Sequence, residues 1–172
     1  MKNLDLPNLR ELYLHRNLIE DIDGLSGCPL LKRLWLCQNK LTGISGLHCV
    51  PELEELYLQG NHINNLDGLE TCEMSLLSLG LAGNPIDEFG ELHKLCQLRR
   101  LRELSCADIH FGSCPIAEQP GYKDFVLSYF EFVRVLDGVV VNADNQFQAE
   151  LSYLEQVSAE QSRAEQSSVH GH

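Results

Sequence analysis

The chain has 172 residues, of which 44% are hydrophobic, and it carries a formal net charge of −12 at pH 7. This length can form one domain with a sizeable core, and no apolar stretch is long enough to cross a membrane. No secretory signal peptide is recognisable at Met1. The acidic balance opposes unspecific binding to nucleic acid or to anionic membranes. We therefore expect a soluble, cytoplasmic protein, with the nucleus as the alternative compartment.

Residues 9–109 repeat one frame. Asn17, Asn39 and Asn61 are 22 residues apart, and a fourth copy ends at Asn84, one residue late, so a single insertion separates the third and fourth copies. Each asparagine follows leucines at fixed spacing: Leu9, Leu12 and Leu14; Leu31, Leu34 and Leu36; Leu53, Leu56 and Leu58; Leu76, Leu79 and Leu81. One such unit cannot bury its leucines alone, whereas stacked units share a continuous apolar wall. The pattern resembles leucine-rich repeats.

Each unit predicts one short strand and one return segment. Leu12 and Leu14 alternate with Glu11, Tyr13 and His15, the period of a strand with one buried face. The asparagines Asn17, Asn39, Asn61 and Asn84 are interpreted as structural turn residues, because an amide can both donate to and accept from the backbone. After them, apolar residues at threefold steps around Gly24, Gly46 and Gly68 predict short helical or 3₁₀ returns.

The frame degenerates after Asn84. A fifth unit has Leu98, Leu101 and Leu104, but Ile109 stands where an asparagine is expected. Residues 88–97 predict a longer helical return with Phe89, Leu92 and Leu95 on its apolar side. Residues 111–121 read as a loop, 122–130 as a helix, and 133–138 as a last strand and turn.

These features together resemble one intracellular family of 22-residue leucine-rich repeats. It is typified by the nuclear phosphatase-1 regulator, the spliceosomal A-prime subunit and the axonemal dynein light chain. Tyr122, Phe130, Leu136 and Asp137 match the cap that closes those arrays. Residues 9–138 are also similar to the terminal module of large cilia-associated leucine-rich-repeat proteins. The resemblance implies an α/β fold: a right-handed, curved solenoid with a parallel sheet on its concave face and helical or 3₁₀ returns on its convex face.

The expected organisation has five parts. Residues 1–8 are the remnant of a preceding repeat, 9–109 the repeats, 110–141 the C-terminal cap, 142–161 an amphipathic helix and 162–172 a disordered tail. Asn145 with Gln148 is expected to cap the helix, whose apolar stripe is Phe147, Leu151, Leu154 and Val157. We expect this stripe to dock on the last repeat of the chain, with docking on a partner as the alternative.

The seven cysteines are an odd number and include no C-x-x-C pair, so neither a zinc site nor a disulfide framework is predicted. Cys28, Cys49 and Cys72 occupy similar points of three returns, and Cys106 replaces a strand leucine. We interpret these four as buried free thiols in a reducing compartment. No metal and no cofactor are expected.

The open face of the sheet contains the candidate binding residues. Equivalent strand positions become lateral neighbours, which predicts an aromatic row of Tyr13, Trp35 and Tyr57 that steps down to a floor of small residues at Gly80 and Ala82. The candidate partner-binding set is Tyr13, His15, Arg33, Trp35, Gln38, Tyr57, Gln59, Gly80 and Ala82. Mutual stacking for stability is the alternative reading of the aromatics. The neighbouring row of Glu11, Arg33 and Glu55 is interpreted chiefly as a charge ladder that satisfies itself.

No catalytic motif is present, and a Cys37–His15 pair would lack both an orienting third group and an oxyanion hole. We therefore expect a scaffold without catalytic activity that binds a protein segment on its concave face, with ciliary or axonemal assembly as the leading setting. The alternative is a regulatory subunit of a phosphatase, or a ribonucleoprotein assembly factor that contacts RNA indirectly. Neither membrane nor direct nucleic-acid binding is expected. The chain is expected to be a monomer unless its uncapped N-terminal edge pairs.

Overall fold

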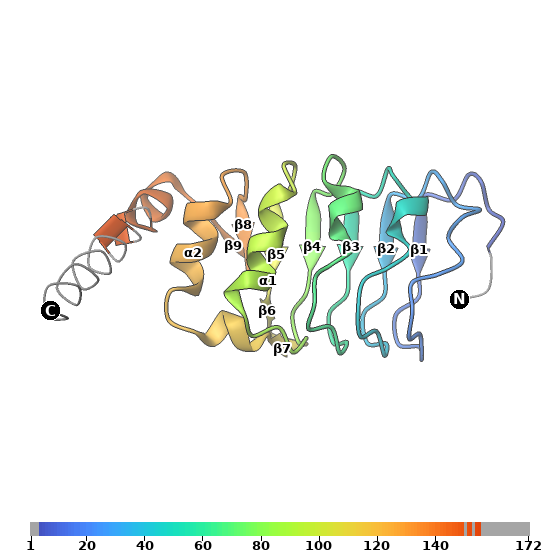
Figure 1. Cartoon of the computed structure of the whole chain (residues 1–172), viewed down its shortest axis with the longest axis horizontal. Coiled ribbons are helices and arrows are strands. Elements are labelled where there is room, and N and C mark those ends of the chain that lie inside the picture. The colour runs from blue at the N-terminus through green and yellow to red at the C-terminus, as the bar shows by residue number, and fades with distance from the viewer. Residues whose placement is uncertain (1–3, 150, 153, 156–172) are drawn as a thin grey trace, which may run out of the picture.

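The computed structural model describes residues 4–149, 151–152 and 154–155. Seven of the strands in these residues stand side by side in one sheet, in the order β1-β2-β3-β4-β5-β8-β9 (Figure 1). Neighbouring strands are parallel from β1 to β8, and β9 pairs with β8 in antiparallel orientation. The strands are β1 (Glu11–Tyr13), β2 (Arg33–Trp35), β3 (Glu55–Tyr57), β4 (Ser78–Gly80), β5 (Glu103–Ser105), β8 (Val135–Leu136) and β9 (Val139–Val140).

The register of the sheet confirms the predicted lateral rows. Tyr13 pairs with Trp35, Trp35 with Tyr57, and Tyr57 with Gly80, while the central leucine of each strand pairs with the next. Leu34, Leu56, Leu79 and Leu104 have no exposed surface. Since every second side chain of a strand lies on the same face, burying these leucines leaves the flanking side chains on the opposite, open sheet face.

The return segments pack against one another behind the buried leucines. They include the 3₁₀ helices η1 (Leu47–Cys49) and η2 (Leu69–Cys72), which confirms the expected returns. The glycines that recur before them adopt positive φ angles, 77° at Gly46 and 102° at Gly68. A Cβ atom at Gly46 would collide with the carbonyl of Ile22, and one at Gly68 with that of Ile44. Glycine therefore recurs because each turn lies directly against the preceding one.

The asparagines join successive repeats. Asn61 Nδ2 donates to Leu36 O at 3.0 Å and to Leu58 O at 2.7 Å, while its Oδ1 accepts from Asn39 N and Leu41 N. Asn39 and Asn84 make corresponding bonds, and all three are nearly fully buried. Asn17 is exposed and donates only to carbonyls of its own turn. This asparagine ladder, formed by Asn39, Asn61 and Asn84, thus begins at the second repeat.

The C-terminal region differs from the repeats before it. The predicted return is α1 (Phe89–Lys94) followed by η3 (Leu95–Gln97), and the predicted cap helix is α2 (Tyr122–Tyr129). The interpretation of residues 111–121 as a loop is wrong in part. They contain β7 (Gly112–Ser113), which pairs with β6 (Ala107–Asp108) as an antiparallel hairpin, and η4 (Pro115–Glu118). The strand signal was too short to detect, since each arm has two residues.

Two expectations about the last helix are corrected. The helix begins at residue 143, and Asn142 Oδ1 accepts from Asn145 N at 2.8 Å, so Asn142 is the cap and Asn145 lies within the helix. The stripe does not dock on the last repeat: Phe147 is 58% exposed and Leu154 62%. The helix instead contacts α2 through Ser128 Oγ, which donates to Ala149 O, and extends away from the sheet (Figure 1). Val157 and the expected tail 162–172 lie outside the described residues.

Candidate functional site

The aromatic row of the open sheet face is a continuous stack. The rings of Tyr13 and Trp35 are stacked with centroids 4.2 Å apart, and those of Trp35 and Tyr57 with centroids 5.3 Å apart. Tyr13 is 56% exposed, and the other two rings are half-buried. The three rings of this aromatic ladder (Tyr13, Trp35 and Tyr57) therefore stack on one another and still expose part of their surface to solvent.

A charge ladder runs beside the aromatic ladder. Arg33 Nη1 lies 2.7 Å from Glu11 Oε1, and Arg33 Nε lies 2.8 Å from Glu55 Oε1. These bonds to Glu55 and Glu11 raise the pKa of the Arg33 guanidinium, and the hydrogen bond to Glu11 raises that of the Tyr13 phenol. Arg33 is thus occupied within its own row, as the alternating signs of the sequence predict.

The remaining polar candidates, His15, Gln38 and Gln59, lie after the strands, and two of them make contacts within the chain. Gln38 is exposed and accepts from Arg16 Nε at 2.9 Å, while His15 is also exposed. Gln59 Oε1 accepts from the Cys37 thiol at 3.1 Å. Burial raises the pKa of Cys37, so its sulfur is held in the poorly nucleophilic thiol form.

The small residues that were expected to be exposed beside the aromatic row, Gly80 and Ala82, are not open to solvent. Ala82 has no exposed surface, so its selection as a contact residue is wrong. Gly80 is also buried, and a Cβ atom there would collide with the amide group of Gln59. The turn between β6 and β7 lies over the neighbouring Gly83, which faces the carbonyl of Phe111. The chain itself covers most of the step that the sequence predicts.

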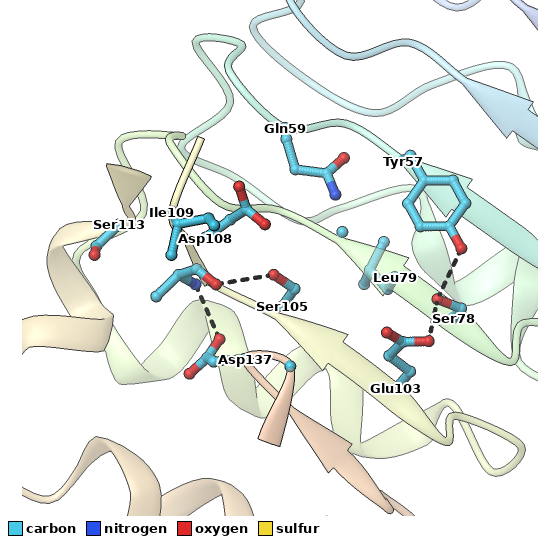
Figure 2. A pocket seen from close by; sticks show the side chains of 13 residues that line it. Tyr57, Gln59, Ser78, Leu79, Glu103, Ser105, Asp108, Ile109, Ser113 and Asp137 are labelled. Carbon is cyan, nitrogen blue, oxygen red and sulfur yellow. Dashed lines mark hydrogen bonds between the residues drawn. The ribbon is translucent and has the colours of Figure 1, made fainter. Parts of the chain in front are cut away.

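The uncovered part of the step is a pocket of about 550 Å³ at the end of the aromatic ladder (Figure 2). Tyr57, Ser78 and Glu103 form one side, and the hairpin contributes Asp108 and Ile109 opposite them. The remaining lining residues are Gln59, Leu79, Gly80, Ser105, Ala107, Ser113, Asp137 and Gly138. The pocket exists because the hairpin folds back over the sheet where a regular repeat would continue outward.

Hydrogen bonds fix both sides of the pocket. Ser78 Oγ lies 3.4 Å from Tyr57 Oη and 3.2 Å from Glu103 Oε2. Burial raises the pKa of Tyr57, and the carboxylates of Glu55 and Glu103 raise it further, so the ring remains a neutral phenol. On the other side, Asp137 Oδ1 accepts from the amides of Cys106 and Ala107 at 2.7 and 2.9 Å. The walls are therefore rigidly held before any partner binds.

Glu103, Asp108 and Ile109 line this pocket but do not belong to the contact set predicted from the sequence. Glu103 follows the same strand frame as Glu11 and Glu55, so its position on the open face is readable from the repeat. Asp108 and Ile109 could not be located without the hairpin, because they follow the point where the frame breaks. Ile109 occupies the expected asparagine position but is 93% exposed.

Comparison with known proteins agrees with the repeat frame. A family model described as leucine rich repeat matches residues 7–63. The chain has the fold of a leucine-rich repeat solenoid. The strand geometry extends the same architecture through β4 and β5, and α2, β8 and β9 close it in the manner of a cap. Members of this family are typically protein-interaction modules without catalytic activity. No curated protein sequence matches the chain.

Solved structures with the same fold include one over nearly its whole length. A chain of the Drosophila melanogaster SNF/U2A' complex superposes with a TM-score of 0.74 at 24% identity, covering 90% of this chain and 93% of that one. Internalin inlF of Listeria monocytogenes gives 0.60 at 20% identity, with 79% and 36% covered. Internalin C2 of the same organism gives 0.51 at 28%, with 58% and 42% covered. This chain thus spans less than half of each of these two internalins.

The part of the chain that the structure describes contains neither a candidate metal site nor a helix that could span a membrane. No group of three His, Cys, Asp or Glu side chains there could hold a metal ion. None of its helices combines the length and the hydropathy that crossing a membrane requires. The open sheet face and its pocket are the candidate site, because they combine partly exposed aromatic rings with a cavity.

Proposed function

We propose that this leucine-rich repeat protein is a non-catalytic scaffold that binds a segment of a partner protein on its open sheet face. The observation that carries the proposal is the aromatic ladder, three stacked rings that a partner can reach from the solvent side. Exposed Trp and Tyr side chains are favoured anchors at protein interfaces, because they bury a large area at small cost in side-chain entropy. The ladder also adjoins a pocket, so a bound segment can be positioned at its end.

The candidate contact set follows from exposure. Tyr13, Trp35 and Tyr57 form its centre, and exposed polar side chains of His15, Arg33 and Gln38 border it. Gln59 lines the pocket together with the ladder residue Tyr57. A set of aromatic anchors with a polar surround is the usual composition of an interface centre.

Cilium or axoneme assembly is the setting we propose first, with the cytoplasm as the compartment. The support is the resemblance of residues 9–138 to the terminal module of large cilia-associated repeat proteins. Seven free cysteines suit a reducing compartment.

A second candidate is a role in ribonucleoprotein assembly. The observation that favours it is the superposition on a chain of the SNF/U2A' complex, which covers nearly all of both chains. With a net charge of −12, we expect such a role to proceed through protein contacts, since phosphate binding needs cationic surface. If RNA binds directly, its affinity will fall steeply with salt concentration.

The test is affinity capture from ciliated and non-ciliated cells with the intact chain as bait. Trp35→Ala combined with Tyr57→Ala should lose at least ~2 kcal/mol of affinity for any specifically captured partner. Phe132→Ala combined with Phe147→Ala is the matched control, because it removes two exposed aromatic rings away from the open sheet face. Binding affinities are measured well below the melting temperature of each variant.

The outcomes separate the candidates. Partners found only in ciliated cells support the ciliary setting, whereas capture of ribonucleoproteins that resists nuclease treatment supports the second candidate. If the control variant loses the partner and the ladder variant keeps it, the surface around Phe132 and Phe147 is the binding surface and the proposal is wrong.

A further inference from the structure

The pocket at the end of the aromatic ladder has a charge imbalance that the ladder lacks. Its lining includes the carboxylates of Glu103, Asp108 and Asp137 and, in the described part of the chain, no Lys, Arg or His. The nearest cationic row residue, Arg33, is held by Glu11 and Glu55. No ion pair between described residues involves any of the three pocket carboxylates. The aromatic part of the face is thus balanced in charge, while the pocket is uniformly acidic.

The carboxylates keep hydrogen-bonding capacity for a ligand. Glu103 accepts from Ser78 through Oε2, and Asp108 accepts from the amides of His110 and Phe111 through Oδ1. Among the described residues, no donor lies within hydrogen-bond distance of Glu103 Oε1 or Asp108 Oδ2. The bonds that are made hold the carboxylates in place, so a cation would meet acceptors that are already oriented.

The other walls suit the stem of a long basic side chain. The Tyr57 ring forms one side, and Ile109, at the exposed turn of the hairpin, forms an apolar rim on the other. Lys and Arg bury their methylene groups along such surfaces while the charged group contacts the acceptors. A volume of about 550 Å³ exceeds what one side chain needs, so it admits neighbouring backbone as well.

We infer that the partner segment is basic and places an arginine or lysine side chain in this pocket, between Glu103 and Asp108. An adjacent apolar residue of the same segment lies on the aromatic ladder. Arginine suits the site better, because its planar guanidinium can bond two carboxylates and stack on the Tyr57 ring. The inference rests on the proposed binding role of the open sheet face and adds the chemistry of the partner to it.

The direct test uses a fluorescently labelled hexa-arginine peptide and its hexa-citrulline counterpart, which has nearly the same shape but no charge. We expect the first to bind the intact chain at physiological ionic strength and the second to bind far more weakly. Amide resonances of Gly80, Ser105 and Gly138 should shift on titration, because these residues line the pocket. Equal binding of the two peptides, or shifts confined to other parts of the chain, would overturn the inference.

Matched variants separate the pocket from the general acidity of the chain. Glu103→Gln with Asp108→Asn removes two charges but retains acceptors for the bonds from Ser78 and the turn amides. Glu20→Gln with Asp21→Asn removes two charges from exposed residues outside the site. The pocket variant should lose at least about tenfold in affinity for hexa-arginine, and the control less than about twofold. Equal losses would assign the binding to net charge and refute the pocket.

The same variants distinguish the two proposals when a cellular partner is captured. If the Trp35→Ala, Tyr57→Ala variant loses the partner while the pocket variant retains it, the scaffold function stands and the basic-segment inference fails. If both variants retain it, both proposals fail. Loss in both, with retention by Glu20→Gln, Asp21→Asn, supports both.

Discussion

The first repeats and the fifth repeat use the same strand frame and differ in the segment directly after the strand. After β2, β3 and β4, a buried asparagine continues the ladder and returns the chain to the convex side. After β5, Ile109 takes that position, and the chain turns back as the β6–β7 hairpin. The open sheet face of the first repeats thus gives way to a walled pocket where the buried asparagine is absent.

The fifth repeat replaces the missing asparagine with two other groups. The Cys114 thiol, directly after β7, donates to Leu81 O at 3.1 Å, which an asparagine of the fifth repeat would reach in a regular array. Asp137, from the turn after β8, accepts the amides of Cys106 and Ala107. The backbone groups are therefore satisfied by segments distant in sequence, and this frees residues 107–113 to form the pocket wall.

The largest expected effect comes from breaking the regular region at Asn39. Asn39→Leu leaves the amide of Ile19 without its partner and removes one of the two side-chain donors to each of the carbonyls of Leu14 and Leu36. We expect a loss of about 3 kcal/mol or more in the free energy of unfolding, measured by urea denaturation.

Asn17→Leu is the matched control, because Asn17 is exposed and bonds only to its own turn. Its cost should stay below about 1 kcal/mol, since water can replace its bonds. Equal effects of the two substitutions would mean that the asparagine bonds between repeats do not stabilise the fold.

The next largest effect is expected at Asp137, which takes over part of the role of the missing asparagine in the C-terminal region. Asp137→Ala removes the acceptor for the amides of Cys106 and Ala107 at a residue with φ of 51°. We expect a loss of about 2 kcal/mol, because a charged acceptor is removed and alanine tolerates positive φ poorly. Asp137→Asn keeps an acceptor and tolerates this φ, so it should lose less than half as much. If Asn were no better than Ala, the carboxylate would act through its charge and not through these bonds.

The regular region could be predicted from the sequence almost completely. The spacing of Asn17, Asn39 and Asn61 fixes which strand positions become neighbours, and the observed register agrees. The Arg33 ladder follows from the same alignment, because side chains of like position lie on one face. Periodicity is informative here since each repeat is constrained by the one before it.

The pocket could not be predicted, because it depends on contacts without a period. Nothing in the sequence near Ile109 indicates that Cys114 and Asp137 satisfy the fifth repeat. The same limit explains the error at Ala82, whose small side chain reads as an open floor until the chain that covers it is known. The exposure of Phe147 was missed for a related reason: an apolar stripe predicts a contact but does not identify the surface it contacts.

A smaller effect is expected on the pH dependence of stability, where a buried tyrosine of the C-terminal region is compared with an exposed one of the first repeats. Tyr122 in α2 is 2% exposed, and burial raises its pKa well above the ordinary value, with Cys106 and Asp137 adding to the shift. Because the folded-state pKa is the higher one, this contribution to stability is fully present below pH ~10 and is lost as pH rises further. Tyr122→Phe should reduce the fall in unfolding free energy above pH ~10 by up to about 1.4 kcal/mol per pH unit.

The exposed Tyr13 of the aromatic ladder provides the control for this experiment. Tyr13→Phe should change the alkaline slope much less than Tyr122→Phe, because a phenol open to solvent ionises without unfolding the chain. The slopes come from urea titrations between about pH 9 and pH 11. An unchanged slope in Tyr122→Phe would show that another group controls alkaline unfolding.

The smallest expected effect is that of reductant, which should leave the melting temperature of the whole chain unchanged. All seven cysteines are free, and five of them, Cys28, Cys37, Cys72, Cys106 and Cys114, are buried. A thiol reagent should therefore reach the half-buried Cys49 and Cys96 first. Among the fully buried thiols, Cys28 should react before Cys106, because Leu12 and Leu14 of the first repeat are only half-buried and local opening begins at such an edge. Mass spectrometry of the labelled chain gives this order. A melting temperature lowered by several degrees on reduction would reveal a disulfide, and labelling of Cys106 before Cys28 would mean that the hairpin and cap open more readily than the first repeat.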